Sequence, residues 1–211
     1  MEAGHHPEIK RHGHFWLELG IAAVLGMTAV ATAFSAYQAG KSERETVAHY
    51  NEGIRDSSLS TGVLLEAEQT LANDQALFLQ YVSAAQTNPD LARYYLTTLM
   101  GPDLRAAVLW WADQDKYKTP FVDANPKYKQ QESFDLGNRL SEQSNELFKD
   151  AQKTHKTSNR YDLVTVILAA ALFMLGVAGV LRHLGLRLAF FSIGSLFFLG
   201  GVIQILRIAV F

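Results

Sequence analysis

Three long stretches without a charged side chain constrain this sequence more than any other feature. Residues 19–37, 163–181 and 188–206 are 19-residue windows that contain no Asp, Glu, Lys or Arg. A helix of about 20 apolar residues is long enough to cross the ~30 Å hydrocarbon core of a bilayer. The sequence therefore predicts an all-α membrane protein with three transmembrane helices.

The segment between the first two windows is long and polar. Residues 41–160 contain 14 Lys and Arg against 17 Asp and Glu. Because this segment is slightly acidic, it offers no basic surface for the phosphate backbone, and we expect no nucleic-acid partner. The chain has no cysteine, which excludes disulfides, zinc–thiolate sites and thiol catalysis.

The polar segment is predicted to be a long helical extramembrane stalk between the first and second spans. No proline interrupts residues 8–88, and Asn88-Pro89 marks a helix stop followed by a new start. A second stop and restart falls at Gly101-Pro102, and residues 115–130 form the longest predicted loop. A second proline-free helix then leads directly into the second span.

These boundaries give a predicted layout of six segments. They are a flexible His-rich tail (1–14), transmembrane helix 1 (15–40), a helical extramembrane domain (41–160), transmembrane helix 2 (161–182), a short basic turn (183–187) and transmembrane helix 3 (188–211). The tail carries four histidines, which either bind a metal ion such as Zn²⁺ or Cu²⁺ or have no specific role. They are His5, His6, His12 and His14.

Basic residues beside the short connections predict the orientation. Lys10 and Arg11 precede the first span, and Arg182 and Arg187 flank the short turn. Short loops that carry Lys and Arg face the cytoplasm. We therefore expect a bacterial or archaeal inner-membrane protein with a cytoplasmic N-terminus and with residues 41–160 external or periplasmic. Basic residues on the opposite side oppose this assignment; they are Lys41, Arg44, Lys149, Lys153, Lys156, Arg160 and, near the end of the third span, Arg207. The first six weigh less, because long translocated segments largely escape the rule.

Four sequence motifs carry a family resemblance. They are ATAFSAYQAGKSERE, PDLRAAVLWW, PFVDANPKY and NRYDLVTVILAAALFMLGVAGVLR. With them the chain resembles an uncharacterised bacterial family of three-span inner-membrane proteins, which have a short tail, a first span that ends in a Tyr-Gln-Ala motif, a helical insertion and two C-terminal spans. The resemblance covers residues 29–206 and implies this architecture, without an activity or site.

Small residues recur along the first span at the spacing that lets helix backbones approach closely. The predicted helix-packing residues are Ala22, Gly26, Thr28, Ala29, Thr32, Ala33, Ala36 and Gly40. The partner for this face is either another span of the same chain or a second copy. Since one chain supplies only three spans, a homo-oligomer is an expected state.

Chemical signatures are sparse. Glu45, His49 and His155 are the candidates for a metal site, although such a group is more often a solvated ion pair with a partly buried histidine. No catalytic or cofactor-binding motif occurs, so we expect neither an enzyme nor a cofactor.

The predicted function is therefore that of a non-catalytic membrane protein that acts through assembly or through protein contacts of its external stalk, with the lipid bilayer as its surroundings. One alternative is a homo-oligomeric channel or pore subunit, with Thr28 and Thr32 lining a conduit. Another is an accessory subunit of a larger complex, in which the partner is a different membrane or periplasmic protein.

Overall fold

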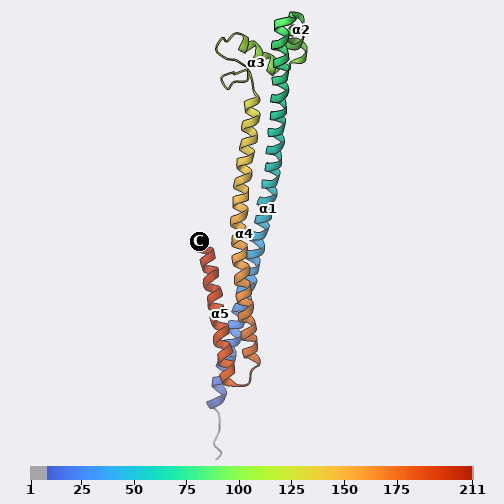
Figure 1. Cartoon of the computed structure of the whole chain (residues 1–211). Coiled ribbons are helices and arrows are strands. Elements are labelled where there is room, and N and C mark those ends of the chain that lie inside the picture. Colours follow the sequence, from blue (N-terminus) through green and yellow to red (C-terminus); the bar gives the residue numbers. More distant parts are fainter. Residues whose placement is uncertain (1–8, 211) are drawn as a thin grey trace, which may run out of the picture. The chain divides into compact units, whose positions relative to one another are not determined.

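The structure is a computed structural model that describes residues 9–210, with side chains from residue 15 onward. Its elements are α1 (Ile9–Thr87), α2 (Pro89–Tyr94), the π-helical turn η1 (Tyr95–Leu99), α3 (Pro102–Ala112), α4 (Gln130–Val180) and α5 (Leu184–Val210), shown in Figure 1. No strand occurs within residues 9–210. The predicted all-α class is confirmed.

Three of the helices, α1, α4 and α5, are long and apolar enough to cross a membrane. This confirms the three apolar helices predicted from the uncharged windows. The turn between α4 and α5 comprises only residues 181–183, so Arg187 lies within α5 and not in the predicted 183–187 turn. Gly185 does not prevent α5 from beginning at Leu184, because one glycine in a helix lowers its stability by only about 1 kcal/mol relative to alanine. The predicted tail also differs in its bounds, because α1 already begins at Ile9, and residues 1–8 lie outside the described part.

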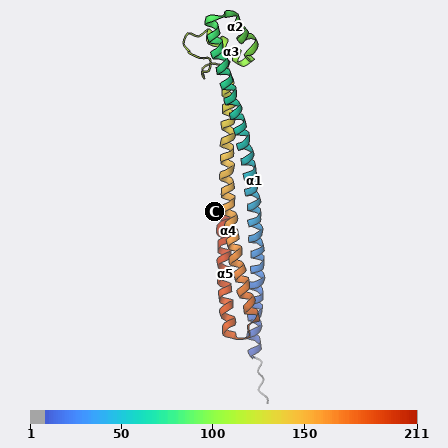
Figure 2. The same cartoon turned by 45° about the vertical axis from the view of Figure 1, so that its right-hand side comes forward.

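The chain divides into two compact units. The apolar unit comprises Met1–His49 with Lys149–Phe211, and the polar unit comprises Tyr50–Phe148. Helices α1 and α4 contribute segments to both units. In the apolar unit, Figures 1 and 2 show α5 lying alongside α4.

In the apolar unit, α1 and α4 pack antiparallel through small side chains. The Ser35 hydroxyl donates to the Tyr161 carbonyl across the contact (2.9 Å), and the Ser158 hydroxyl donates to the Ala39 carbonyl (3.0 Å). A serine side chain is short, so it reaches a backbone carbonyl of the neighbouring helix only when the two backbones lie close together. Buried residues of α1 recur mostly at intervals of seven: Ile21, Thr28, Ser35, Ala39 and Thr46. That is the period of paired helices.

Glycines set the contact between α4 and α5. A Cβ atom added at Gly194 would lie 2.8 Å from Leu175 Cγ, and one added at Gly201 would lie 2.6 Å from Leu168 Cδ2. Both leucines are fully buried. The two glycines are one heptad apart, and they allow α5 to lie directly against the leucine side chains of α4.

In the polar unit, α1 and α4 again pack through small residues at seven-residue intervals. The Ser60 hydroxyl donates to the Gly137 carbonyl (2.7 Å), and the Ser144 hydroxyl donates to the Gly53 carbonyl (2.9 Å). The Gln130 side-chain amide donates to the carbonyl of Ala67, one heptad beyond Ser60 (2.6 Å). Each layer therefore joins a polar side chain of one helix to a backbone carbonyl of the other.

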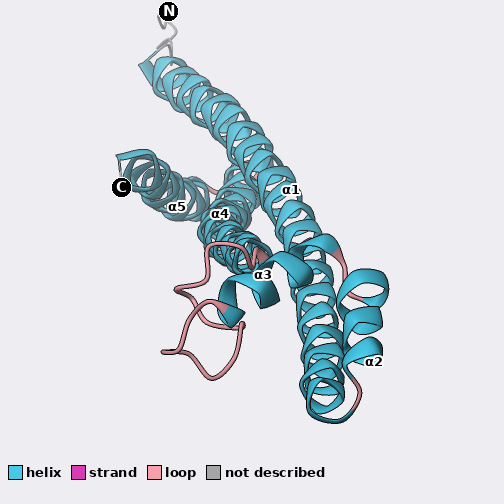
Figure 3. Ribbon diagram, turned by 90° about the horizontal axis from the view of Figure 1, so that it is seen from above, coloured by secondary structure: helices cyan, strands magenta, loops and turns pink. Residues whose placement is uncertain are grey.

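The hydrophobic core of the polar unit lies where α3 and the loop after it meet α1 (Figure 3). Phe78 of α1 contacts the rings of Trp111 and Phe121 edge-on, at centroid distances of 5.0 and 5.6 Å. The fully or nearly fully buried members of this core are Phe78, Met100, Leu104 and Val108. Buried apolar area of this kind provides the main stabilisation of a small helical unit.

Side-chain hydrogen bonds fix the irregular parts of the polar unit. The Arg105 guanidinium donates to the carbonyls of Leu96 (2.8 Å), Thr97 (2.7 Å) and Met100 (3.0 Å), which lie in and just after η1. In the loop after α3, the Asn125 side-chain amide donates to the Ala107 and Pro120 carbonyls (3.2 and 2.8 Å). Asn125 is therefore a buried anchor of the loop, not an exposed tip.

Candidate functional site

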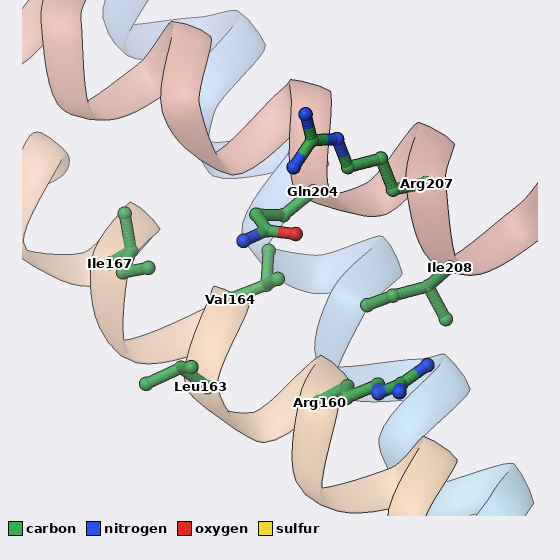
Figure 4. Close-up of a pocket in the computed structure, with 7 residues that line it drawn as sticks. All are labelled: Arg160, Leu163, Val164, Ile167, Gln204, Arg207 and Ile208. Atoms are coloured by element: carbon green, nitrogen blue, oxygen red, sulfur yellow. The ribbon is translucent and has the colours of Figure 1, made fainter.

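A groove of about 590 Å³ lies between α4 and the C-terminal part of α5. Its lining residues are Arg160, Leu163, Val164, Ile167, Gln204, Arg207 and Ile208. Figure 4 shows Gln204 and Ile208 extending from α5 toward α4, with Arg160 on the α4 side and Arg207 on the α5 side. On α5 the groove follows Gly201, and its lining includes Ile208, which lies one heptad beyond that glycine. The arrangement combines an apolar slot with two guanidinium groups.

Most of the predicted small-residue face of α1 does not pack within the chain. Thr28 is completely buried and Thr32 is half-buried, and each hydroxyl donates to a carbonyl of its own helix, at Val24 and Thr28 respectively (both 2.7 Å). The other six residues are exposed: Ala22, Gly26, Ala29, Ala33, Ala36 and Gly40. The heptad face, and not the four-residue face, is therefore the one that meets α4.

A shallow apolar groove follows part of this exposed face. It measures about 620 Å³. Its lining residues are Ala22, Ala23, Gly26, Met27, Val30, Ala31 and Phe34. None of its lining residues is charged, and no element of residues 9–210 covers it.

The predicted topology residues do not share one environment. Arg182 is exposed, whereas Arg187 is only 8% exposed and pairs with Glu18 of α1 (Nη1 to Oε1, 3.3 Å). Arg187 Nε has no hydrogen-bond partner among the described residues. The side chains of Lys10 and Arg11 lie outside the described part. Because the Glu18 carboxylate neutralises Arg187 locally, Arg187 contributes less to the positive charge of the turn than the sequence suggested.

The predicted metal candidates are not brought together. His155 Nδ1 lies 3.6 Å from the Glu43 carboxylate, while the Glu45 carboxylate pairs with Lys41 at 3.9 Å. No cluster of three or more His, Asp or Glu side chains suited to a metal ion occurs among the described residues. The α1–α4 register explains this, since it places residue 43 and not residue 45 beside His155.

His49, the third metal candidate, lies near an acidic residue of α4. A hydrogen bond from Lys153 (2.8 Å) lowers the pKa of Asp150 below its ordinary value, and the charge of His49 contributes to the same shift. The structure therefore places the half-buried His49 near Asp150 and not beside the other two metal candidates.

One polar pair lies beside the core of the polar unit. The Tyr128 hydroxyl donates to the Asp74 carboxylate (3.2 Å). Burial raises the pKa of Asp74, and the hydrogen bond from Tyr128 partly offsets this effect. Burial also raises the pKa of Tyr128, and the negative charge of Asp74 raises it further. With Asp74 on α1 and Tyr128 in the loop, the pair ties the loop to the helix, and the negative charge of Asp103 on α3 also raises the pKa of Asp74.

No protein-family model matches the chain, no curated protein is similar to it, and no solved structure matches its fold.

Sequence reasoning missed the functional potential of Arg160 and Arg207. It treated each as an isolated charge beside a span. The available signal was their shared position, since Arg160 lies three residues before the second uncharged window and Arg207 directly follows the third. In an antiparallel pair of apolar helices these two positions lie at the same end of the uncharged stretches.

Proposed function

We propose that the protein is a non-catalytic inner-membrane protein of a bacterium or archaeon that assembles with copies of itself through the exposed small-residue face of α1. The observation that carries the proposal is the unpartnered face at Ala22 and Gly26, with its uncharged groove. Small residues in membrane helices are sites of close backbone approach, whereas a purely lipid-facing helix has no need of them. The resemblance to the three-span family is compatible with this proposal and stays a prediction.

The channel alternative has less support. Thr28 is buried against the chain's own helices, and its hydroxyl already donates to a backbone carbonyl. Ser35 is likewise buried and donates to Tyr161 on α4. The hydroxyl groups of Thr28 and Ser35 are therefore not available to line a conduit between copies, and other side chains would have to do so.

Gly26→Leu is the first test of assembly. A Cβ at Gly26 meets no atom within 4 Å, so the variant leaves the protomer intact while its side chain fills the groove. We expect the association constant to fall at least tenfold, about 1.4 kcal/mol, because two backbones can no longer approach closely. The measurement is the oligomer distribution over a range of protein-to-lipid or protein-to-detergent ratios, by mass photometry or light scattering.

Gly176→Leu is the matched control. Gly176 lies in the apolar part of α4, is exposed, and also has no atom within 4 Å of an added Cβ. We expect this variant to associate like the wild type. A wild-type protein that stays monomeric at every ratio, or equal loss of association in both variants, would rule out the α1 face as the interface.

We also propose that the N-terminus is cytoplasmic and that residues 41–160 are external. Single cysteines in this cysteine-free chain test the orientation. Ala124→Cys lies in an exposed part of the loop after α3, and Gly185→Cys lies in the first turn of α5 with open space around its Cβ. Asn125 is unsuitable for labelling because it is buried and hydrogen-bonded.

A membrane-impermeant maleimide should label Ala124→Cys in intact cells whose outer membrane, if present, has been permeabilised. It should label Gly185→Cys only after lysis. The opposite pattern would place the polar unit in the cytoplasm, while leaving the proposed α1 interface open to the assembly test.

A further inference from the structure

We propose that the groove between α4 and α5 binds one anionic phospholipid from the leaflet on the side of the polar segment. Its two guanidinium groups would hold the phosphate headgroup, and its apolar walls would hold part of an acyl chain. This inference does not depend on assembly, because all the lining residues come from one protomer.

The two arginines supply the charge. Arg160 and Arg207 border the uncharged stretches of α4 and α5, so both lie at the level of the lipid headgroups. Neither guanidinium forms a hydrogen bond or ion pair with another described residue. Guanidinium groups bind phosphate oxygens through paired, charge-assisted hydrogen bonds. Both arginines line the groove, Arg160 from α4 and Arg207 from α5, so an anion bound there would meet positive charge from both walls.

The walls make the site amphipathic. Leu163, Val164 and Ile167 of α4 and Ile208 of α5 form the apolar lining, and the amide of Gln204 adds a further polar group. The volume of about 590 Å³ falls within the range of ligand sites, roughly 300–1,000 Å³. Basic pockets between membrane helices are places where anionic lipid headgroups bind.

Charge complementarity selects the class of lipid. A zwitterionic headgroup would place its ammonium group near two guanidinium groups, whereas phosphatidylglycerol carries a net negative charge and no cation. The slot is continuous with the apolar surface of α4 and α5, so a lipid can enter from the bilayer without leaving it. A water-soluble anion lacks the acyl chain that the apolar walls would bind.

The experiment is native mass spectrometry of the purified full-length protein, released from micelles with equal amounts of phosphatidylglycerol and phosphatidylcholine. We expect the first phosphatidylglycerol adduct to be at least fivefold more abundant than the phosphatidylcholine adduct. The Arg160→Gln/Arg207→Gln variant should lose this preference. The control, Lys41→Gln/Arg44→Gln, removes two charges from exposed residues just beyond the first uncharged window and should keep it.

A second variant tests the apolar part of the site. Ile208→Trp would fill the slot while keeping both arginines, and we expect it to reduce the phosphatidylglycerol adduct at least threefold. Added inorganic phosphate should not displace the lipid. Equal binding of both lipids, retention of the preference in the Arg160→Gln/Arg207→Gln variant, or its loss in the control would overturn the proposal.

Discussion

Phe78→Ala is expected to destabilise the polar unit by about 3–5 kcal/mol, the range for removing a large aromatic side chain from a core. Phe78 contacts Trp111 and Phe121 edge-on and packs in the buried cluster with Met100 and Leu104. Few other buried apolar residues hold α3 and the following loop, so the loss removes much of the stability of this region. Hydrogen exchange on the full-length protein should show lost protection in residues 95–129.

Leu79→Ala is the matched control for this prediction. Leu79 follows Phe78 directly but is 67% exposed. Surface substitutions of this kind usually change the free energy of unfolding by less than about 0.5 kcal/mol. Equal loss of protection in the two variants would mean that the buried aromatic cluster does not stabilise α3 and its loop.

Gly137→Ala and Gly62→Ala are expected to change stability in opposite directions. A Cβ at Gly137 would lie 2.6 Å from both Cγ and Cδ2 of Leu64, which forces the leucine or the backbone to move. Overpacking of this kind costs about 1–3 kcal/mol. Gly62, also in a helix of the polar unit, has no atom within 4 Å of an added Cβ, so alanine there should add up to about 1 kcal/mol through helix propensity.

Denaturant unfolding of both variants measures the change in the free energy of unfolding, and hydrogen exchange across residues 51–75 and 130–147 shows where it arises. We expect a decrease for Gly137→Ala and an increase for Gly62→Ala. If Gly137→Ala were as stable as the wild type, the α1–α4 contact would have room for a methyl group. The close approach implied by the Ser60–Gly137 hydrogen bond would then be wrong.

Proline positions allowed much of the fold to be predicted from the sequence. Pro89 and Pro102 each stand in the first turn of a short helix, as predicted, and Asn88 caps the first of them through a bond from the Leu91 amide (3.2 Å). Proline fixes its own φ and lacks an amide hydrogen, so its effect on helix boundaries is local. The π-helical turn η1 was not predicted, because it depends on a contact that is not local in the sequence. Arg105 donates to the carbonyl of Leu96, nine residues earlier in the chain.

The packing face of α1 was harder to predict, because it depends on the partner helix. Small residues four apart, such as Ala22 and Gly26, favoured one face, yet the chain packs through Thr28 and Ser35 at a spacing of seven. The relevant sequence signal was the coincidence of two heptad series, one in each long helix. They are Ala39, Thr46, Gly53, Ser60 and Ala67 in α1, and Gly137, Ser144, Ala151 and Ser158 in α4.

The metal candidates show the same dependence on register. Glu45 and His155 would lie at similar heights on the two helices if Gln38 lay opposite Asp162. The hydrogen bond from Ser158 to Ala39 sets a register about three residues different from that assumption. A shift of about three residues displaces the paired positions by about 4.5 Å along the helices, so no residue-level site could be assigned before the pairing was known.

The serine and glycine layers of the polar unit repeat every seven residues, so they restrict how the length of its paired helices can change. One layer joins Gly53 to Ser144 and the next joins Ser60 to Gly137, and the two are nearly interchangeable. An insertion or deletion of seven residues in both helices together, about 10 Å of length, would restore every hydroxyl to a carbonyl. A change of any other size, or in one helix alone, would break the series. Length in this hairpin can therefore evolve only in matched steps of one heptad.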